Sequence, residues 1–343
     1  MTTPPPRSTS RSLLGAVDLG VLRFLTGGPS RREARDRLAR LHETVTRVAP
    51  ILDWFSAPPP PGELTLGLES AARSPGAWRT VVWPSDARPR LAGPHEARLL
   101  QASNALARCQ VRRGASGAPA LLLVHGHLLG EDTLQRALLP WRGAASEGWT
   151  VVLLTLPLHG QRHVRGAALP GSNPVLNLEA VAQGVRDLLQ LDEALRGAGV
   201  AGVLWGGQSL GGLAVSLAAM CRQPAGVALL SPLLSLARLA FDGGALGVGA
   251  PAEELLETLS LLYAPVTPTA QRMRVPASGW FVSAARDDRI TPMDEVKRFA
   301  RELNVPVRWH SGSHLVPLGE GWHRRGFDAW RRRIALPLPE APR

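Results

Sequence analysis

The sequence predicts an α/β protein in which a mostly parallel central sheet is flanked by helices. Short apolar runs alternate with stretches of helical periodicity from about residue 64 to residue 335, as in strands joined by helical crossovers. The central runs, among them Ala120–Val124 and Trp149–Thr155, are rich in Val and Leu, which is typical of strands covered on both faces. Residues Gly207–Gly211 separate an apolar run from a helical stretch, which indicates a strand, a tight turn and a helix in succession.

The first 62 residues are predicted to form a helical appendage. Leu13–Leu25 is apolar but interrupted by charges, and no small-residue cleavage pattern follows it. We therefore expect an amphipathic helix that docks on the domain or on a membrane surface, and no secretory signal. A second helix is predicted over 30–50 and a Pro-rich linker over Ala57–Gly62. The rest of the chain, 63–343, is assigned to the α/β domain.

The elements of that domain follow from periodicity. Strands are expected at Trp78–Trp83, Cys109–Arg112, Ala120–Val124, Trp149–Thr155, Gly202–Trp205, Gly226–Leu230, Gly279–Ala284 and Pro306–His310. Helices are expected at Thr133–Ala145, Leu178–Arg196, Leu210–Arg222, Met293–Leu303 and Trp322–Ala335. The stretch 233–275 is too long for a plain crossover and holds a predicted helix at Glu253–Leu262. It is expected either to cap a cleft or to add surface helices.

Composition narrows the class of protein. The chain has 343 residues, 45% of them apolar, which is enough to bury a core without disulfides. Its two cysteines, Cys109 and Cys221, are too few for a disulfide framework or a four-cysteine zinc site. We expect both to be reduced and buried. This favours a cytoplasmic protein, with peripheral membrane contact through the N-terminal segment.

The net charge of +11 does not point to nucleic acid. Lys297 is the only lysine among 39 basic residues, and the chain has one tyrosine. Such an arginine skew reflects composition bias, and a base-stacking platform is poorly supported. Attraction to anionic surfaces is the remaining consequence of the charge.

Ser209 is the candidate nucleophile. It occupies the centre of the motif Gly-Gln-Ser-Leu-Gly after the apolar run 203–205. A turn this tight puts serine in a strained backbone conformation at the end of a strand, and leaves no space for side chains at 207 and 211. The following helix directs its first N–H groups, including that of Leu210, to the same place, where they would stabilise negative charge.

A serine nucleophile needs a base and an acid that orients the base. In this strand order the acid is expected after a late strand and the histidine after the last one. Asp288 lies in the loop after Gly279–Ala284, and His314 follows Pro306–His310. Asp287 is the alternative acid.

Two further loops follow central strands. His125-Gly126-His127 comes after Ala120–Val124, and its loop is expected to supply the second oxyanion N–H, from His127. A metal site at His125 and His127 with His159 and His163 is the alternative, but no set of carboxylates accompanies them. We predict no metal or other cofactor.

The loop after Trp149–Thr155 should border the same edge of the sheet. It contains His159 and Arg162. These two side chains are predicted either to contact substrate or to serve loop packing and the surface.

These motifs resemble the α/β-hydrolase superfamily over about residues 64–335. A narrower resemblance is to the subgroup of abhydrolase domain-containing protein 18. It rests on the N-terminal Leu/Phe helix ending at 26–29, the Leu-Pro-Leu-His-Gly-Gln-Arg loop 156–162 and the Gly-Gln-Ser-Leu-Gly-Gly elbow 207–212.

The superfamily implies a serine hydrolase that acts through Ser209, His314 and Asp288. One departure is Thr155-Leu156-Pro157, where many relatives carry an acidic residue. A carboxylic ester hydrolase acting on a small-molecule, lipid or apolar acyl ester is the first hypothesis. Acyl transfer, thioester or amide hydrolysis on the same triad, and a catalytically silent binding protein, are the alternatives.

Overall fold

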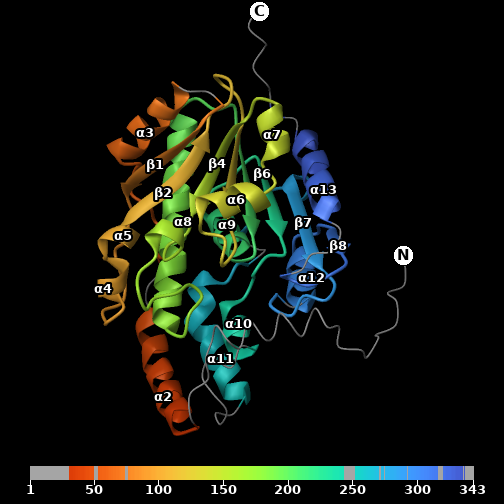
Figure 1. The fold of residues 1–343 in the computed structure, drawn as a ribbon. Helices are drawn as coiled ribbons and strands as arrows, with labels where there is room; N and C mark the ends of the chain where they lie inside the picture. Colours follow the sequence, from red (N-terminus) through yellow and green to blue (C-terminus); the bar gives the residue numbers. More distant parts are fainter. Residues whose placement is uncertain are drawn as a thin grey trace, which may run out of the picture.

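An eight-stranded sheet forms the centre of the part of the chain that the computed structural model describes, namely 31–49, 53–73, 76–242, 252–269, 272–273, 275–291, 293–315, 320–334 and 336. Its strand order is β1-β2-β4-β3-β5-β6-β7-β8 (Figure 1). The strands are β1 Trp78–Pro84, β2 Leu106–Arg112, β3 Ala120–Val124, β4 Thr150–Thr155, β5 Val203–Gln208, β6 Gly226–Leu230, β7 Trp280–Ala285 and β8 Val307–His310. β2 runs antiparallel to β1 and β4, and β3 to β8 are parallel.

The predicted α/β class is confirmed, and the parallel strands explain the apolar runs. Every residue of β3, β4, β6 and β7 is buried, because helices cover both faces of the sheet (Figure 1). On one face pack α3 Gly62–Ala72, α8 Pro174–Gly197, α9 Leu210–Cys221 and α12 Met293–Glu302. On the other face pack α7 Arg142–Ser146 and α13 Glu320–Arg333.

Three local expectations need correction. The helix predicted over Thr133–Ala145 is two helices, α6 Asp132–Leu138 and α7, because Pro140 lies between them and cannot continue a helix. Helix α3 was not predicted, although it buries Leu64, Leu68 and Ala71 along one face. Cys109 is buried as predicted, but Cys221, at the last residue of α9, is only partly buried.

Three helices lie beyond the carboxyl ends of the parallel strands (Figure 1). α10 Leu236–Asp242 and α11 Ala252–Tyr263 come from the long segment between β6 and β7. α2 Arg31–Val48 comes from the N-terminal appendage and packs against α11. His42 Nε2 lies 2.7 Å from Thr258 Oγ1. The predicted helix at Leu13–Leu25 and the start of the helix predicted over 30–50 fall outside the described residues.

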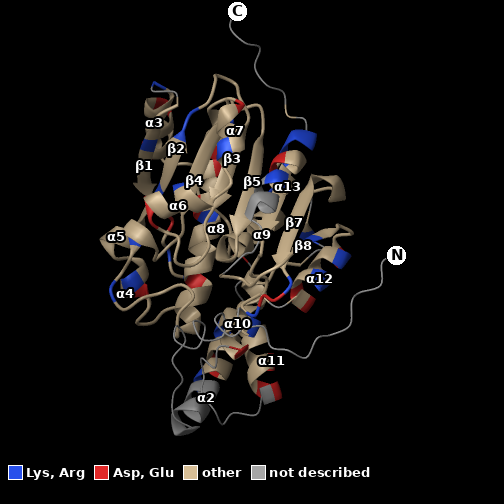
Figure 2. Cartoon of the chain, turned by 45° about the vertical axis from the view of Figure 1, so that its right-hand side comes forward, with Lys and Arg blue, Asp and Glu red and all other residues tan. Residues whose placement is uncertain are grey.

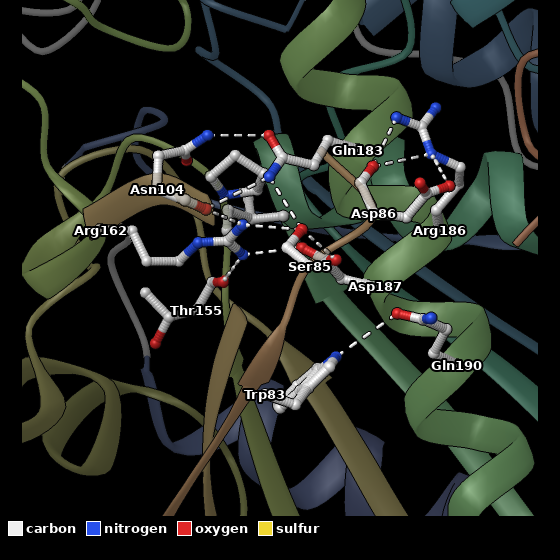
Figure 3. A network of polar contacts seen from close by, with 12 residues as sticks. Trp83, Ser85, Asp86, Asn104, Thr155, Arg162, Gln183, Arg186, Asp187 and Gln190 are labelled. Atoms are coloured by element: carbon white, nitrogen blue, oxygen red, sulfur yellow. Dashed lines mark hydrogen bonds and ion pairs between the residues drawn. The ribbon is translucent and has the colours of Figure 1, made fainter. Parts of the chain in front are cut away.

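A buried polar network ties the outer segments to α8 (Figure 3). Arg162, from the loop after β4, pairs with Asp187 of α8 at 2.8 Å, and their side chains are 1% and 0% exposed. Arg162 also donates to the backbone carbonyls of Thr155 and Asn104, and Ser85 donates to Asp187 at 2.6 Å. The connections flanking β1 and β2 are therefore fixed by side chains of a single helix.

Charged residues elsewhere mark the outside of the molecule. In Figure 2 both signs occur together on α4 Glu96–Leu99, α12 and α13. Arg331 of α13 is buried and joins the partly exposed Glu147 through two bonds of 2.6 and 2.9 Å. This contact lowers the pKa of Glu147 to about 2. Among the described helices, none has the length and apolar character needed to cross a membrane.

Asp187→Asn should lower the free energy of unfolding by about 3 kcal/mol, because it leaves the buried Arg162 guanidinium without its counter-charge. Urea denaturation gives the value. Glu295→Gln is the matched control: it removes a pair with Arg298 whose side chains are 27% and 58% exposed, and should cost less than about 1 kcal/mol. Equal effects in the two variants would contradict the structural importance of the buried pair.

Candidate active site

Ser209 lies in a strained turn between β5 and α9. Its φ of 51° and ψ of −115° lie outside the regions that a serine favours, at a cost of about 1–3 kcal/mol. Backbone bonds hold the turn against the end of β6. The Ser209 N–H donates to the Leu230 carbonyl at 3.0 Å, and the Ser209 carbonyl accepts from the Leu233 N–H at 2.9 Å. The strain is thus maintained by the neighbouring strand.

Two glycines allow this turn, as the sequence predicts. A Cβ on Gly207 would lie 2.3 Å from the Gly211 carbonyl oxygen, and one on Gly211 would lie 2.2 Å from that of Val124. These are backbone atoms that cannot rotate away. α9 can start directly after Ser209 because its first turn lies against both β3 and β5.

The three predicted side chains meet at this turn. His314 Nε2 lies 2.8 Å from Ser209 Oγ, and His314 Nδ1 lies 2.7 Å from Asp288 Oδ2. Because a carboxylate only accepts, Nδ1 carries the proton and Nε2 is left to accept from the serine hydroxyl. The side chains of Ser209, His314 and Asp288 are therefore joined in one line of hydrogen bonds.

Of the two candidate acids, Asp288 is the one in contact with His314. Asp288 is buried, and its Oδ1 accepts from the backbone N–H groups of Ile290 and Thr291 at 2.9 and 2.7 Å. The Thr291 hydroxyl donates to Oδ2 at 2.5 Å. Asp287 is partly exposed, and its backbone N–H donates to Gly312. Thr291 is the residue that the sequence reasoning missed, although a Thr three residues after an Asp is a known turn signal.

The loop after β3 approaches the serine. A Cβ on Gly126 would lie 3.1 Å from Cβ of Ser209, which places the backbone of 126–127 beside this serine. The N–H groups of His127 and Leu210 therefore stay the candidate oxyanion donors. Leu128 has a φ of 70°, so this loop is itself strained.

Three histidines from two loops pack together beside this backbone. The ring centroids of His125 and His127 lie 5.1 and 5.5 Å from that of His159. The Nδ1 atom of each faces a carbonyl oxygen, those of Gly126, Leu169 and Pro157, at 2.7 to 2.9 Å. Since a carbonyl only accepts, all three rings carry their proton on Nδ1. His125 Nε2 then accepts from the Leu156 N–H at 3.0 Å.

Burial keeps these imidazoles neutral. It lowers the pKa of His125 to about 4 and holds the pKa values of His127 and His159 below the ordinary value. Among the described residues, no group of three or more His, Cys, Asp or Glu side chains is placed to hold a metal ion.

Arg162 is not brought to the site. It is fully buried and pairs with Asp187 of α8, as described above. Loop packing and substrate contact were the two alternatives for Arg162, and its contacts match loop packing. The side chain packs in the core, however, and not at the surface. His159 lies against His127, with its Nε2 atom 3.3 Å from His127 Nδ1.

The sheet order together with the β5–α9 elbow defines the α/β-hydrolase fold. TT1662 from Thermus thermophilus superposes with a TM-score of 0.50 at 19% identity, over 74% of this chain and 98% of that chain. Est1E from Butyrivibrio proteoclasticus with ferulic acid bound gives 0.51 at 12% identity, over 67% and 95%. A lipase in its open form gives 0.51 at 16% identity, over 76% and 99%.

No model of a protein family and no curated protein sequence matches the chain. At identities this low the structural likeness establishes the fold alone, and the function has to be argued from the site.

Nitrogen-15 NMR of the imidazoles should show His125, His127 and His159 neutral and protonated on Nδ1 at pH 7. His125 should titrate only near pH 4. Its protonation favours the unfolded chain, so this residue makes stability fall as the pH drops from about 6.5 towards 4. An Nε2 proton on any of the three rings, or a His125 midpoint near 6.5, would contradict the assigned hydrogen bonds.

Proposed function

We propose that this protein is a serine hydrolase that cleaves carboxylic esters with an apolar acyl group. The observation that supports this most directly is the line from Ser209 Oγ to His314 to Asp288, with contacts of 2.8 and 2.7 Å. The three residues come from the ends of three different strands. A structural serine would not need a strained turn, a histidine and a buried carboxylate arranged in this order.

The chemistry follows from these contacts. Ser209 Oγ attacks the ester carbonyl carbon while its proton passes to His314 Nε2, and Asp288 stabilises the imidazolium. The tetrahedral intermediate collapses when Nε2 returns that proton to the leaving alcohol, which gives an acyl-enzyme. Water then attacks the acyl group by the same proton route, releasing the acid and restoring the serine.

The developing oxyanion needs donors that are already in place. The backbone N–H groups of Leu210 and His127 are proposed for this purpose. Leu210 opens α9, so the helix dipole adds to its effect. His127 follows Gly126, where the lack of a side chain lets the loop approach Ser209.

Two exposed leucines favour an apolar acyl group. Leu128 directly follows His127 and is 55% exposed, and Leu315 directly follows His314 and is 38% exposed. Each is one residue from the proposed machinery, so apolar surface borders the reacting carbonyl. Helices α2, α10 and α11 lie beyond the same edge of the sheet (Figure 1), and we propose that they form a cap over the substrate.

The finer assignments from sequence stay predictions. These are the resemblance to the abhydrolase domain-containing protein 18 subgroup, the cytoplasmic location and the peripheral membrane contact. Est1E with its ferulic acid and the open-form lipase share the fold. The mechanism above depends only on residues of this chain.

Ser209→Ala should abolish labelling by a fluorophosphonate probe and lower kcat for p-nitrophenyl butyrate by about 10⁴-fold or more. Ser209→Gly should be equally inactive but more stable by about 1 kcal/mol, because glycine relieves the strain at φ 51°. Mass spectrometry of the labelled peptide and thermal unfolding give the two readouts. Full labelling in Ser209→Ala would remove the nucleophile assignment.

Asp288→Asn should lower kcat by about 10³- to 10⁴-fold, since the amide no longer holds His314 in the right tautomer. Asp287→Asn is the matched control and should stay within a few-fold of the parent enzyme. A larger loss in the Asp287 variant would reverse the assignment of the acid.

A series of p-nitrophenyl esters tests the substrate class. We expect kcat/KM to rise from acetate to octanoate, because each buried methylene contributes about 0.8 kcal/mol at most. Leu128→Ser together with Leu315→Ser should flatten this rise while acetate hydrolysis is kept. A flat series in the parent enzyme would speak against an apolar acyl group.

A further inference from the structure

The loops that follow β3 and β4 are joined at three successive levels. His125 Nε2 accepts from the Leu156 N–H at 3.0 Å, and His127 Nδ1 lies 3.3 Å from His159 Nε2. At the third level a Cβ on Gly160 would lie 2.3 Å from the Gly130 carbonyl oxygen, so two bare backbones touch. The two loops therefore contact each other at three points, between residues 125–130 and 156–160.

The His127 ring has a second contact, with the segment that precedes α8. The Leu169 carbonyl oxygen lies 2.9 Å from His127 Nδ1. Two residues further on, Gly171 exchanges a pair of 2.8 Å bonds with Asn177 at the start of α8. Asn177 also donates to the Tyr263 hydroxyl of α11 at 3.2 Å. The Nδ1 proton of His127 is thus shared between the Leu169 carbonyl and His159 Nε2. Further contacts fix both acceptors: the Gly171–Asn177 bonds lie near Leu169, and His159 Nδ1 bonds to Pro157.

These anchors have a mechanical reason. The next residue, Leu128, has a φ of 70°, and a strained loop keeps its shape only when its surroundings fix it. The ring of His127 and its backbone N–H belong to one residue, so holding the ring holds the N–H. Leu158, in the loop after β4, has a φ of 64° and also needs surroundings that fix its conformation.

We propose that His159 is a positioning residue for the oxyanion site: its Nε2 accepts a hydrogen bond from His127 Nδ1–H and so holds the His127 backbone N–H beside Ser209. This inference rests on the proposed function. It replaces the expectation that His159 contacts substrate, because the buried ring spends both nitrogens on protein, Nδ1 on Pro157 and Nε2 on His127.

Two variants of His159 separate its two contacts. In His159→Asn the amide can still donate to Pro157, but no atom reaches His127. In His159→Gln the amide oxygen can accept from His127. A misplaced oxyanion donor costs about 10- to 100-fold in rate. We therefore expect kcat for p-nitrophenyl butyrate to fall by that factor in His159→Asn, with KM changed less than about 3-fold, and to recover within about 5-fold in His159→Gln.

A trifluoromethyl ketone inhibitor gives a readout that a merely structural effect would not move. It forms a tetrahedral adduct with serine, so its inhibition constant should weaken in His159→Asn by the same factor as kcat/KM. The pH midpoint of kcat/KM should not change. His163→Asn, an exposed histidine of the same loop, is the matched control and should behave as the parent enzyme.

Hydrogen exchange of the His127 backbone amide tests the positioning without any substrate. It should be faster in His159→Asn than in the parent and slow again in His159→Gln. If the parent enzyme neither hydrolyses esters nor reacts with a fluorophosphonate, the proposed function fails, and this exchange result still decides whether His159 holds His127.

Three outcomes overturn the inference: unchanged kcat, inhibition constant and exchange in His159→Asn; equal losses in the Asn and Gln variants; or a change in KM alone. Should His159→Asn fail to fold, His127→Asn and His127→Leu test the same contact from its partner. Asn keeps a donor at the Nδ1 position and Leu does not, so only the Leu variant should lose rate and amide protection.

Discussion

The close backbone packing at the start of α9 is the constraint on which the rest of the site depends. Gly207 and Gly211 let the helix begin against β3 and β5, because a Cβ at these positions would lie 2.3 and 2.2 Å from backbone carbonyl oxygens. That packing forces Ser209 into its strained conformation and directs the first N–H groups of the helix to the serine. The Leu230 and Leu233 contacts then hold the strain in place. The proposed nucleophile and the proposed oxyanion site thus depend on a single steric requirement.

Strain is concentrated where the parallel strands end. Among the described residues other than glycine, five have a positive φ. Four of these lie within four residues of the ends of β3, β4, β5 and β6: Leu128, Leu158, Ser209 and Ser231. The regular strands form a rigid sheet edge, and the loops with irregular backbone that carry the candidate site start from this edge. The buried network on α8 complements this arrangement, because it fixes the loop after β4 through Arg162 and the segment after β1 through Ser85.

The sequence predicted those features in which a residue type fits only one environment. Apolar runs predicted the strands to within about three residues, and the glycines around Ser209 predicted the turn. It failed where a side chain has two plausible environments. For Arg162 substrate contact and loop packing at the surface were both left open, and its burial in an ion pair with Asp187 was not foreseen. Leu169 was not singled out, since its importance comes from a contact with His127, which is distant in the chain. Thr291 was not singled out either, although its partner Asp288 is a local one. The positions of Ser209, Asp288 and His314 after successive strands could be predicted, because they depend only on the order of the strands along the chain.

The helical layer beyond the strand ends is assembled from two distant stretches of chain. α2 of the N-terminal appendage packs on α11 of the segment between β6 and β7, and His42 meets Thr258 there. Leu41 and Val48 of α2 are buried in the common core. Shortening either α2 or α11 would therefore expose apolar surface on the other, so a truncation of one helix should loosen both.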